Sequence, residues 1–151
     1  MSSIDLNLLQ HQSALKIKKE ATATYILDVV RNKYLVLQPE ELVRQMLLHY
    51  LLTDKKYPLG KIAVEVGLIV NELQKRCDIL LYDSQFRPYM IVECKAPTVL
   101  LNDAVLFQAA TYNLPLKVPY IMLSNGVSNF CARLDYEQQS FMILDEIPDP
   151  A

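Results

Sequence analysis

The fold of this chain is decided by two apolar segments that flank a short turn, Arg76-Cys77-Asp78-Ile79-Leu80-Leu81-Tyr82-Asp83 and Met90-Ile91-Val92-Glu93-Cys94-Lys95-Ala96-Pro97. Their length and their aliphatic content predict two neighbouring β-strands. Three charged residues, Asp78, Glu93 and Lys95, interrupt these otherwise apolar runs. A charge in a buried strand costs free energy unless it is paired or holds a metal ion. These three positions therefore need a chemical explanation.

The spacing of the three charges suggests one. Glu93 and Lys95 are two positions apart on a predicted strand, so their side chains project from the same face, about 7 Å apart. Asp78 begins the preceding strand, and antiparallel pairing across the short turn would bring it near Glu93. Two carboxylates and a lysine are the groups needed to hold Mg²⁺ and activate a water molecule, which indicates phosphodiester hydrolysis. The residues alone leave open an alternative, a Glu–Lys ion pair on an exposed sheet face.

Composition sets the outer limits. The chain has 151 residues, of which 52% are hydrophobic and 21% charged, so we expect one domain with a single packed core over residues 1–151. No apolar run approaches the roughly 20 residues that span a bilayer, and the first residues lack the pattern of a signal peptide. We therefore expect a cytoplasmic protein that does not enter a membrane.

The charge balance excludes a general attraction to nucleic acid, because the net charge is -2. Any DNA contact would need locally clustered basic residues. Such clusters occur at residues 16–19, 55–61 and 75–76, although surface lysines are most often only solvated charges. Three cysteines without CxxC spacing suggest neither a zinc site nor a disulfide framework. Cys77 and Cys94 alternate with the charged residues, so we expect both to point away from the charged face into the core.

Working outward, the pattern predicts an α/β fold with a mixed β-sheet flanked by helices. Pro39 and the acidic residues after it predict the start of a helix, and Asn102 predicts the cap of a second helix that runs to about Leu114. Strands are expected at 62–70, 77–82, 89–95 and 118–123, with short extra strands at 14–19, 22–27 and 35–37 and a terminal hairpin at 129–134 and 140–144. Residues 1–12 and 147–151 are expected to be flexible.

Six short segments, in this order along the chain, resemble a known family: residues 39–45, 62–65, 76–79, 92–97, 108–113 and 123–126. Together they resemble the N-terminal nuclease domain of type I restriction enzyme R subunits, in a small stand-alone form, within the PD-(D/E)XK nuclease superfamily. A lone Glu-x-Lys is a weak signal, but six segments in register are a specific one. The resemblance implies a restriction-endonuclease-like fold, DNA as the substrate, and other restriction-system subunits or a helicase as further partners.

Carried over residue by residue, the resemblance implies that Asp78 and Glu93 are metal ligands and that Lys95 is the catalytic lysine. It also implies that the backbone carbonyl of Cys94 completes the coordination of Mg²⁺, for which Mn²⁺ can substitute. Gln108 and Tyr112 match a Gln-x-x-x-Tyr element of these nucleases and share a helix face, although the pair taken alone favours an ordinary helix face with a core-facing tyrosine. The chain departs from the superfamily pattern at Cys77, where a proline often precedes the aspartate.

An additional glutamate ligand is common in the superfamily. At 100° per residue, Glu40 lies about 60° from Val43 at the centre of the apolar stripe, and Glu41 about 160° away. Glu40 is therefore the better inward-facing candidate, Glu65 is a second, and a simple helix N-terminal charge is the alternative. Arg76 either contacts a DNA phosphate or is a surface charge.

The sequence thus favours a Mg²⁺-dependent DNA nuclease domain. The competing hypothesis is a catalytically inactive DNA-binding or assembly module that retains the nuclease fold. The intact set of Asp78, Glu93 and Lys95 favours the enzyme.

Overall fold

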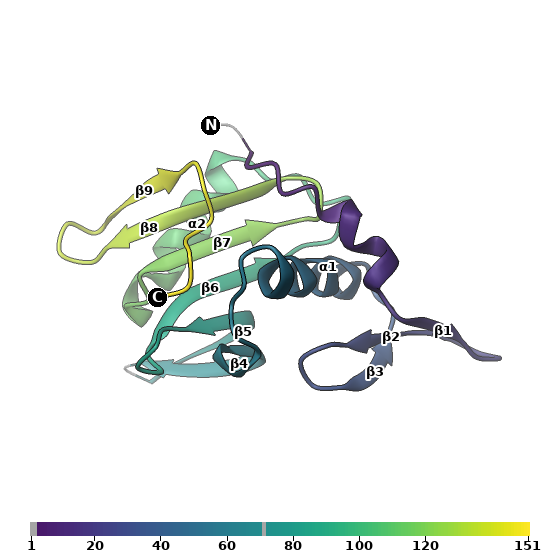
Figure 1. The fold of residues 1–151 in the computed structure, drawn as a ribbon. Helices are drawn as coiled ribbons and strands as arrows, with labels where there is room; N and C mark the ends of the chain where they lie inside the picture. The colour runs from purple at the N-terminus through teal and green to yellow at the C-terminus, as the bar shows by residue number, and fades with distance from the viewer. Residues whose placement is uncertain (1–2, 71) are drawn as a thin grey trace.

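The computed structural model describes residues 3–70 and 72–151 (Figure 1). Its centre is a mixed sheet of six strands in the order β4-β5-β6-β7-β8-β9, in which β6 and β7 are parallel and the other neighbours are antiparallel. The strands are β4 (Ile62–Val70), β5 (Leu73–Tyr82), β6 (Pro88–Cys94), β7 (Tyr120–Ser124), β8 (Asn129–Asp135) and β9 (Ser140–Leu144). This arrangement confirms the predicted α/β fold with a mixed sheet.

Two helices cover opposite faces of the sheet (Figure 1). Helix α1 (Pro39–Thr53) packs its apolar residues against Ile79, Val92 and Met122 of the central strands. Helix α2 (Asp103–Asn113) covers the other face, where its Leu106 and Ala110 meet β7 and β8. Because both faces are covered, the central strands are apolar at almost every position rather than at alternate ones.

Helix α2 is the crossover that makes β6 and β7 parallel. The Asn102 side chain accepts a hydrogen bond from the Val105 amide at 3.0 Å, as its place before the helix predicts. The helix is followed by the short 3₁₀ helix η3 (Leu114–Leu116), whose proline prevents further α-helix. The Lys95 amide then donates to the Ser124 carbonyl at 2.8 Å, so the ends of β6 and β7 lie together.

The outer part of the β4–β5 hairpin leaves the sheet. The pairs between β5 and β6 run from Tyr82↔Pro88 to Ile79↔Val92, whereas β4 and β5 stay paired as far as Val70↔Leu73. Near the point of separation, Glu65 has a left-handed φ of 51°, and no pair is formed between Val64↔Ile79 and Val66↔Cys77. A bend at this point turns the hairpin into a two-stranded arm.

A separate sheet of three strands precedes α1. It consists of β1 (Ile17–Lys19), β2 (Thr24–Asp28) and β3 (Lys33–Val36), all antiparallel. It projects from the body of the protein, on the side away from β7 to β9 (Figure 1). These are the short extra N-terminal strands that the sequence predicts.

Both chain ends, which the sequence predicts to be flexible, contact the body of the protein in the described residues, and residues 1–2 of that prediction lie outside them. Residues 8–14 form the 3₁₀ helix η1 (Leu8–Ala14), with Leu6, Leu8 and His11 buried against the α1 side of the core. At the other end Ile147 is buried, and the Tyr57 hydroxyl donates to the Pro148 carbonyl at 2.6 Å. The sequence missed both because their few apolar residues are covered only by contacts with distant parts of the chain.

Candidate active site

Asp78 lies where β5 and β6 separate. The last pair of the ladder is Ile79↔Val92, so Asp78 and Glu93 occupy the next positions on the two strands. The Asp78 carboxylate accepts a hydrogen bond from the Cys94 amide at 2.7 Å. This bond replaces a strand-to-strand bond and holds the carboxylate between the two strand ends.

A cavity of about 140 Å³ opens from Asp78 toward the first turn of α1. Its lining includes four carboxylates and one guanidinium: Gln38, Glu40, Glu41, Arg44, Glu65, Asp78 and Cys94. Glu93 and Lys95 instead line a cavity of about 280 Å³ beside α2, together with Gln108 and Tyr112. The structure therefore divides the predicted residues between two cavities, with Asp78 and Cys94 lining one and Glu93 and Lys95 lining the other.

Gln108 and Tyr112 lie as their spacing predicts. Both project from α2 into the cavity that contains Glu93 and Lys95, and Tyr112 is 49% exposed. Beneath them, the side-chain amide of buried Asn113 lies 3.4 Å from the Glu93 carboxylate and donates to the Ala109 carbonyl at 2.7 Å. Asn113 thus links Glu93 to the helix, a role that nothing in the sequence pattern indicated.

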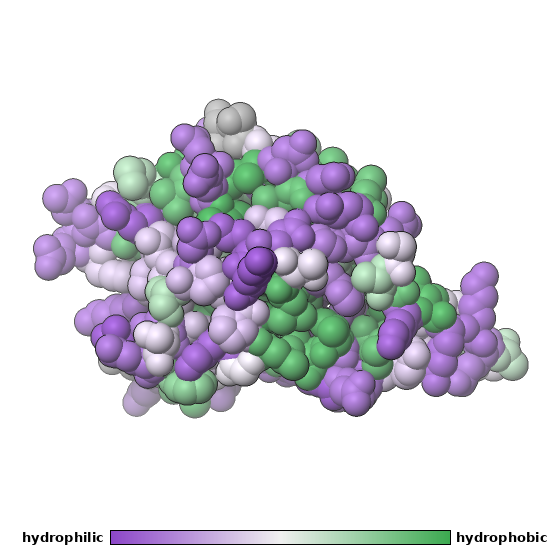
Figure 2. Space-filling model, viewed as in Figure 1, coloured by the Kyte–Doolittle hydropathy of each residue, from purple (hydrophilic) through white to green (hydrophobic). Residues whose placement is uncertain are grey.

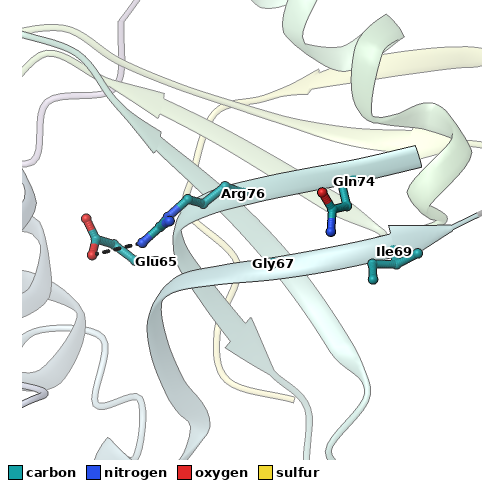
Figure 3. A pocket seen from close by; sticks show the side chains of 5 residues that line it. All are labelled: Glu65, Gly67, Ile69, Gln74 and Arg76. Atoms are coloured by element: carbon teal, nitrogen blue, oxygen red, sulfur yellow. Dashed lines mark hydrogen bonds and ion pairs between the residues drawn. The ribbon is translucent and has the colours of Figure 1, made fainter. Parts of the chain in front are cut away.

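Glu65 is surrounded by three arginines. Its carboxylate lies 2.9 Å from Arg31, 3.5 Å from Arg44 and 3.4 Å from Arg76. Figure 3 shows Arg76 reaching from β5 toward Glu65 at the bend of β4. Arg76 is 73% exposed, and the open face of the arm beside it is lined by Gly67, Ile69 and Gln74. The sequence predicted Glu65 as a candidate for an additional metal ligand. In the structure its carboxylate forms ion pairs with arginines.

The helix geometry predicted that Glu40 faces inward and Glu41 outward, and the structure shows the reverse. Glu40 is exposed at the rim of the smaller cavity, whereas the Glu41 side chain is only 10% exposed. Arg44 binds Glu41 through two nitrogens, of which Nε lies at 2.9 Å, and Gln45 adds a bond of 3.0 Å. The prediction of Glu40 as the inward-facing residue is wrong because Val43 is not the centre of a single apolar stripe. The first turns of α1 are buried on the Arg44 side as well.

The pKa values separate Asp78 from the neighbouring carboxylates. Burial raises the pKa of Asp78 above its ordinary value, the nearby charge of Glu93 adds to the increase, and the Cys94 amide and Arg44 only partly oppose it. Burial would also raise the pKa of Asp28 and of Glu65, but in both the hydrogen bonds and charges of arginines outweigh it and lower the pKa. Asp78 is therefore less compensated by positive charge than Asp28 and Glu65.

The two cysteines are buried, as expected, but on different faces. Cys94 packs in the α1 core, and Cys77 packs with Leu80 and Ile91 on the opposite face. Strict alternation would place Cys77 on the same face as Ile79, so the alternation breaks at Asp78. The break coincides with the bend of the arm.

Sequence reasoning missed an ion network that joins the N-terminal sheet to α1. Asp28 is completely buried and bonds Arg31 at 2.6 Å, and Arg31 also bonds Glu65. The Gln45 side chain accepts from the Val29 amide at 3.1 Å. The spacing of Glu41, Arg44 and Gln45 at i, i+3 and i+4 was the available signal. Among the described residues, no group of three or more His, Cys, Asp and Glu side chains is arranged to hold a metal ion.

Comparison with known proteins identifies the family. Residues 39–148 match the family described as "Type I restriction enzyme R protein N terminus". The chain belongs to this family. The match covers α1, the six-stranded sheet and both cavities, and it begins after the three-stranded sheet.

A solved structure supports the same fold. It is a fragment described as an HsdR subunit of a type I restriction enzyme from Vibrio vulnificus YJ016, similar with a TM-score of 0.51 and 20% sequence identity. The similarity covers 75% of this chain and 24% of that one, so the chain spans about a quarter of its length. No curated protein sequence matches the chain. Within the part of the chain that is described, no helix is long and apolar enough to cross a membrane.

Proposed function

We propose that this chain is a divalent-metal-dependent DNA nuclease domain of a restriction system. One observation carries the proposal. Asp78, with a half-buried carboxylate and a raised pKa, and Glu93 occupy the first positions after the point where β5 and β6 separate, and Lys95 follows directly after β6. Membership in the restriction R-protein family supports the reaction class.

The residues at this point fit Mg²⁺ better than a softer metal. Mg²⁺ prefers oxygen ligands and binds through one or two carboxylates, retaining water and substrate phosphates. The Asp78 and Glu93 carboxylates and the Cys94 carbonyl would hold it without a third acidic side chain. When bound, the ion would polarise the phosphate and lower the pKa of a bound water. A nearby cation would also compensate the charge of Asp78, which the protein leaves under-compensated.

The remaining residues act on the substrate. Lys95, which shares a cavity with Glu93, would orient the attacking water or stabilise the charge that develops on the phosphate. Gln108 and Tyr112, at the rim of that cavity, would contact the DNA strand. Tyr112→Phe should then weaken cleavage or DNA affinity while stability changes by less than about 1 kcal/mol, as is usual outside the core. Unchanged cleavage in this variant would assign the pair to the scaffold.

The direct test is cleavage of supercoiled plasmid, linear duplex and single-stranded DNA in Mg²⁺, Mn²⁺ or EDTA. We expect metal-dependent cleavage that Asp78→Asn, Glu93→Gln and Lys95→Ala each abolish. Glu137→Gln, an exposed change in the turn between β8 and β9, is the matched control and should cleave normally. Cleavage that survives in Asp78→Asn and Glu93→Gln would refute the proposed site.

Metal binding can be measured without cleavage. Calorimetry should detect Mg²⁺ or Mn²⁺ binding that Asp78→Asn removes. In an NMR titration the Cys94 amide should shift on adding Mg²⁺, because the carboxylate that accepts from it would be shared with the cation.

A second candidate function is a DNA-binding or assembly module without catalysis. It is favoured by one observation: the Asp78 carboxylate already accepts from the Cys94 amide, and among the described residues no group of three or more His, Cys, Asp and Glu side chains is arranged to hold a metal ion. DNA binding without cleavage in any divalent metal would select this function over the nuclease.

A further inference from the structure

The three-stranded N-terminal sheet has one face with no role in the core. The register places Lys18, Tyr25 and Val36 opposite one another, so they share a face. Ile26, which points to the other face, is completely buried, and Asp28 beside it is buried and bonded to Arg31. The face with Lys18 therefore points outward. It carries exposed side chains on a sheet that precedes the family match of residues 39–148.

This sheet is basic in an otherwise acidic chain. Residues 14–37 contain five basic residues (Lys16, Lys18, Lys19, Arg31, Lys33) and two acidic ones (Glu20, Asp28), a net charge of 5 - 2 = +3. The whole chain has a net charge of -2, so the other residues sum to -2 - 3 = -5. Asp28 is buried against Arg31, which leaves Glu20 as the exposed acidic residue of this segment. In the view of Figure 2 the surface over this sheet is mixed, with hydrophilic residues at its projecting end and hydrophobic residues toward the body of the protein.

Two tyrosines on the sheet hold a lysine in place. The Lys18 ammonium lies 4.2 Å from the ring centre of Tyr34 and 5.9 Å from that of Tyr25. A cation over an aromatic ring is attracted by the ring but keeps its full charge. Lys18 also approaches Glu20 at 3.4 Å, an exposed pair that contributes little. Tyr34 is 40% exposed and Tyr25 is half-buried, and lysines beside an accessible aromatic ring are typical of surfaces that bind nucleic acid.

The sheet adjoins the candidate active site. Arg31, in the turn between β2 and β3, bonds Glu65 at 2.9 Å, and Val29 bonds Gln45 of α1. Gln38, two residues after β3, lines the same cavity as Asp78. The sheet that carries the outward face is thus connected to the cavity through the turn and through the end of β3.

We propose that the outward face of β1–β3 binds the phosphate backbone of DNA next to the candidate active site, with Lys16 and Lys18 as the main phosphate contacts. The choice of DNA as the bound polyanion rests on the proposed function. It adds a contact surface that lies outside the family match. DNA is favoured over an acidic protein surface because the face combines positive charge with the exposed Tyr34 ring, on a sheet beside the cavity that the proposed function assigns to DNA hydrolysis.

The test compares two pairs of lysine substitutions with equal charge change. Lys16→Ala/Lys18→Ala removes the proposed contacts, and Lys56→Ala/Lys117→Ala removes two exposed lysines elsewhere. Binding of a short labelled duplex is measured in EDTA between about 50 and 200 mM salt. Two lost phosphate contacts should lower the slope of log K against log salt by about 1.8 and weaken binding by tens-fold near 0.1 M salt. The control pair should keep the wild-type slope.

Lys16→Arg/Lys18→Arg should restore both the slope and the affinity, because arginine keeps the charge and also stacks on tyrosine. Equal loss in the two alanine pairs, no loss in either, or no measurable DNA binding by the wild-type chain would each overturn the inference. Failure of the proposed function looks different. DNA binding that depends on Lys16 and Lys18 without cleavage would retain the inference and refute the nuclease. Metal-dependent cleavage with unaltered DNA binding in Lys16→Ala/Lys18→Ala would retain the nuclease and refute the inference.

Discussion

Arg44 offers a quantitative test of the ion network beside Asp78. Its side chain is only 7% exposed and binds Glu41, which is 10% exposed. It also lies 3.5 Å from Glu65, whose side chain is 35% exposed. Arg44→Met keeps much of the aliphatic volume but removes the guanidinium. Glu41 would then be a buried carboxylate with only the Gln45 amide as a partner, at 3.0 Å.

The expected loss follows from burial. Removing one partner of a buried ion pair costs about 3–5 kcal/mol, because the other charge remains uncompensated. The Glu65 contact adds at most about 1 kcal/mol, since that carboxylate is partly exposed and keeps Arg31. At about 2–4 °C per kcal/mol for a domain of this size, Arg44→Met should lower Tm by roughly 6–24 °C.

Urea denaturation followed by circular dichroism measures this loss, with Glu41→Gln and the double variant completing the cycle. The double variant Glu41→Gln/Arg44→Met should be more stable than Arg44→Met, because no uncompensated charge remains. A loss below about 1 kcal/mol in Arg44→Met, or a double variant no more stable than Arg44→Met, would refute the reasoning. Glu40→Gln, an exposed change in the same helical turn, is the control and should leave stability nearly unchanged.

Three further predictions address the site, its pH dependence and its supporting loop. Lys95→Ala should abolish cleavage while the free energy of unfolding and the DNA affinity stay nearly unchanged, and a variant that unfolds would make Lys95 structural. The lowered pKa of Asp28 stabilises the fold above its ordinary value of 3.8, and this stability should be lost as the pH falls through the lower folded-state value. The raised pKa of Asp78 has the opposite effect on stability, so Asp78→Asn should be more stable than wild type above that pKa. Urea midpoints measured over a pH series for wild type, Asp28→Asn and Asp78→Asn check both predictions. Gly126→Ala should destabilise by about 1–3 kcal/mol in the same assay, because Gly126 has φ 90° and an added Cβ would lie 3.2 Å from Val43; equal stability would mean that the loop relaxes.

Much of the fold could be predicted because local signals agreed with the tertiary arrangement. Pro39 and Asn102 mark the beginnings of α1 and α2, and apolar runs mark every strand of the six-stranded sheet. The two chain ends could not be predicted in this way. Their burial depends on contacts such as the Ile4 amide with the Asn129 carbonyl, between residues 125 positions apart.

The candidate site, like the fold, could be predicted from the sequence only where local patterns determine it. Glu93 lies in β6 and Lys95 directly follows its end, and Gln108 and Tyr112 share a helix face, so their grouping in pairs follows from the periods of strand and helix. The α1 glutamates were assigned the wrong way round because the direction of Glu41 is set by Arg44, and Arg44 is buried only by packing that one helix cannot reveal.

The sequence by itself determined the order and type of the central elements and the positions of the three charges that interrupt two apolar strands. It did so because hydrophobic period, proline and capping residues act within a few positions of the chain. Only the tertiary structure decided that β5 bends away from β6 at Asp78, that Glu65 is paired with arginines from three elements, and that a basic sheet lies beside the cavity. These features depend on ion pairs and burial between residues far apart in sequence, whose free energies exist only once the chain has brought them together.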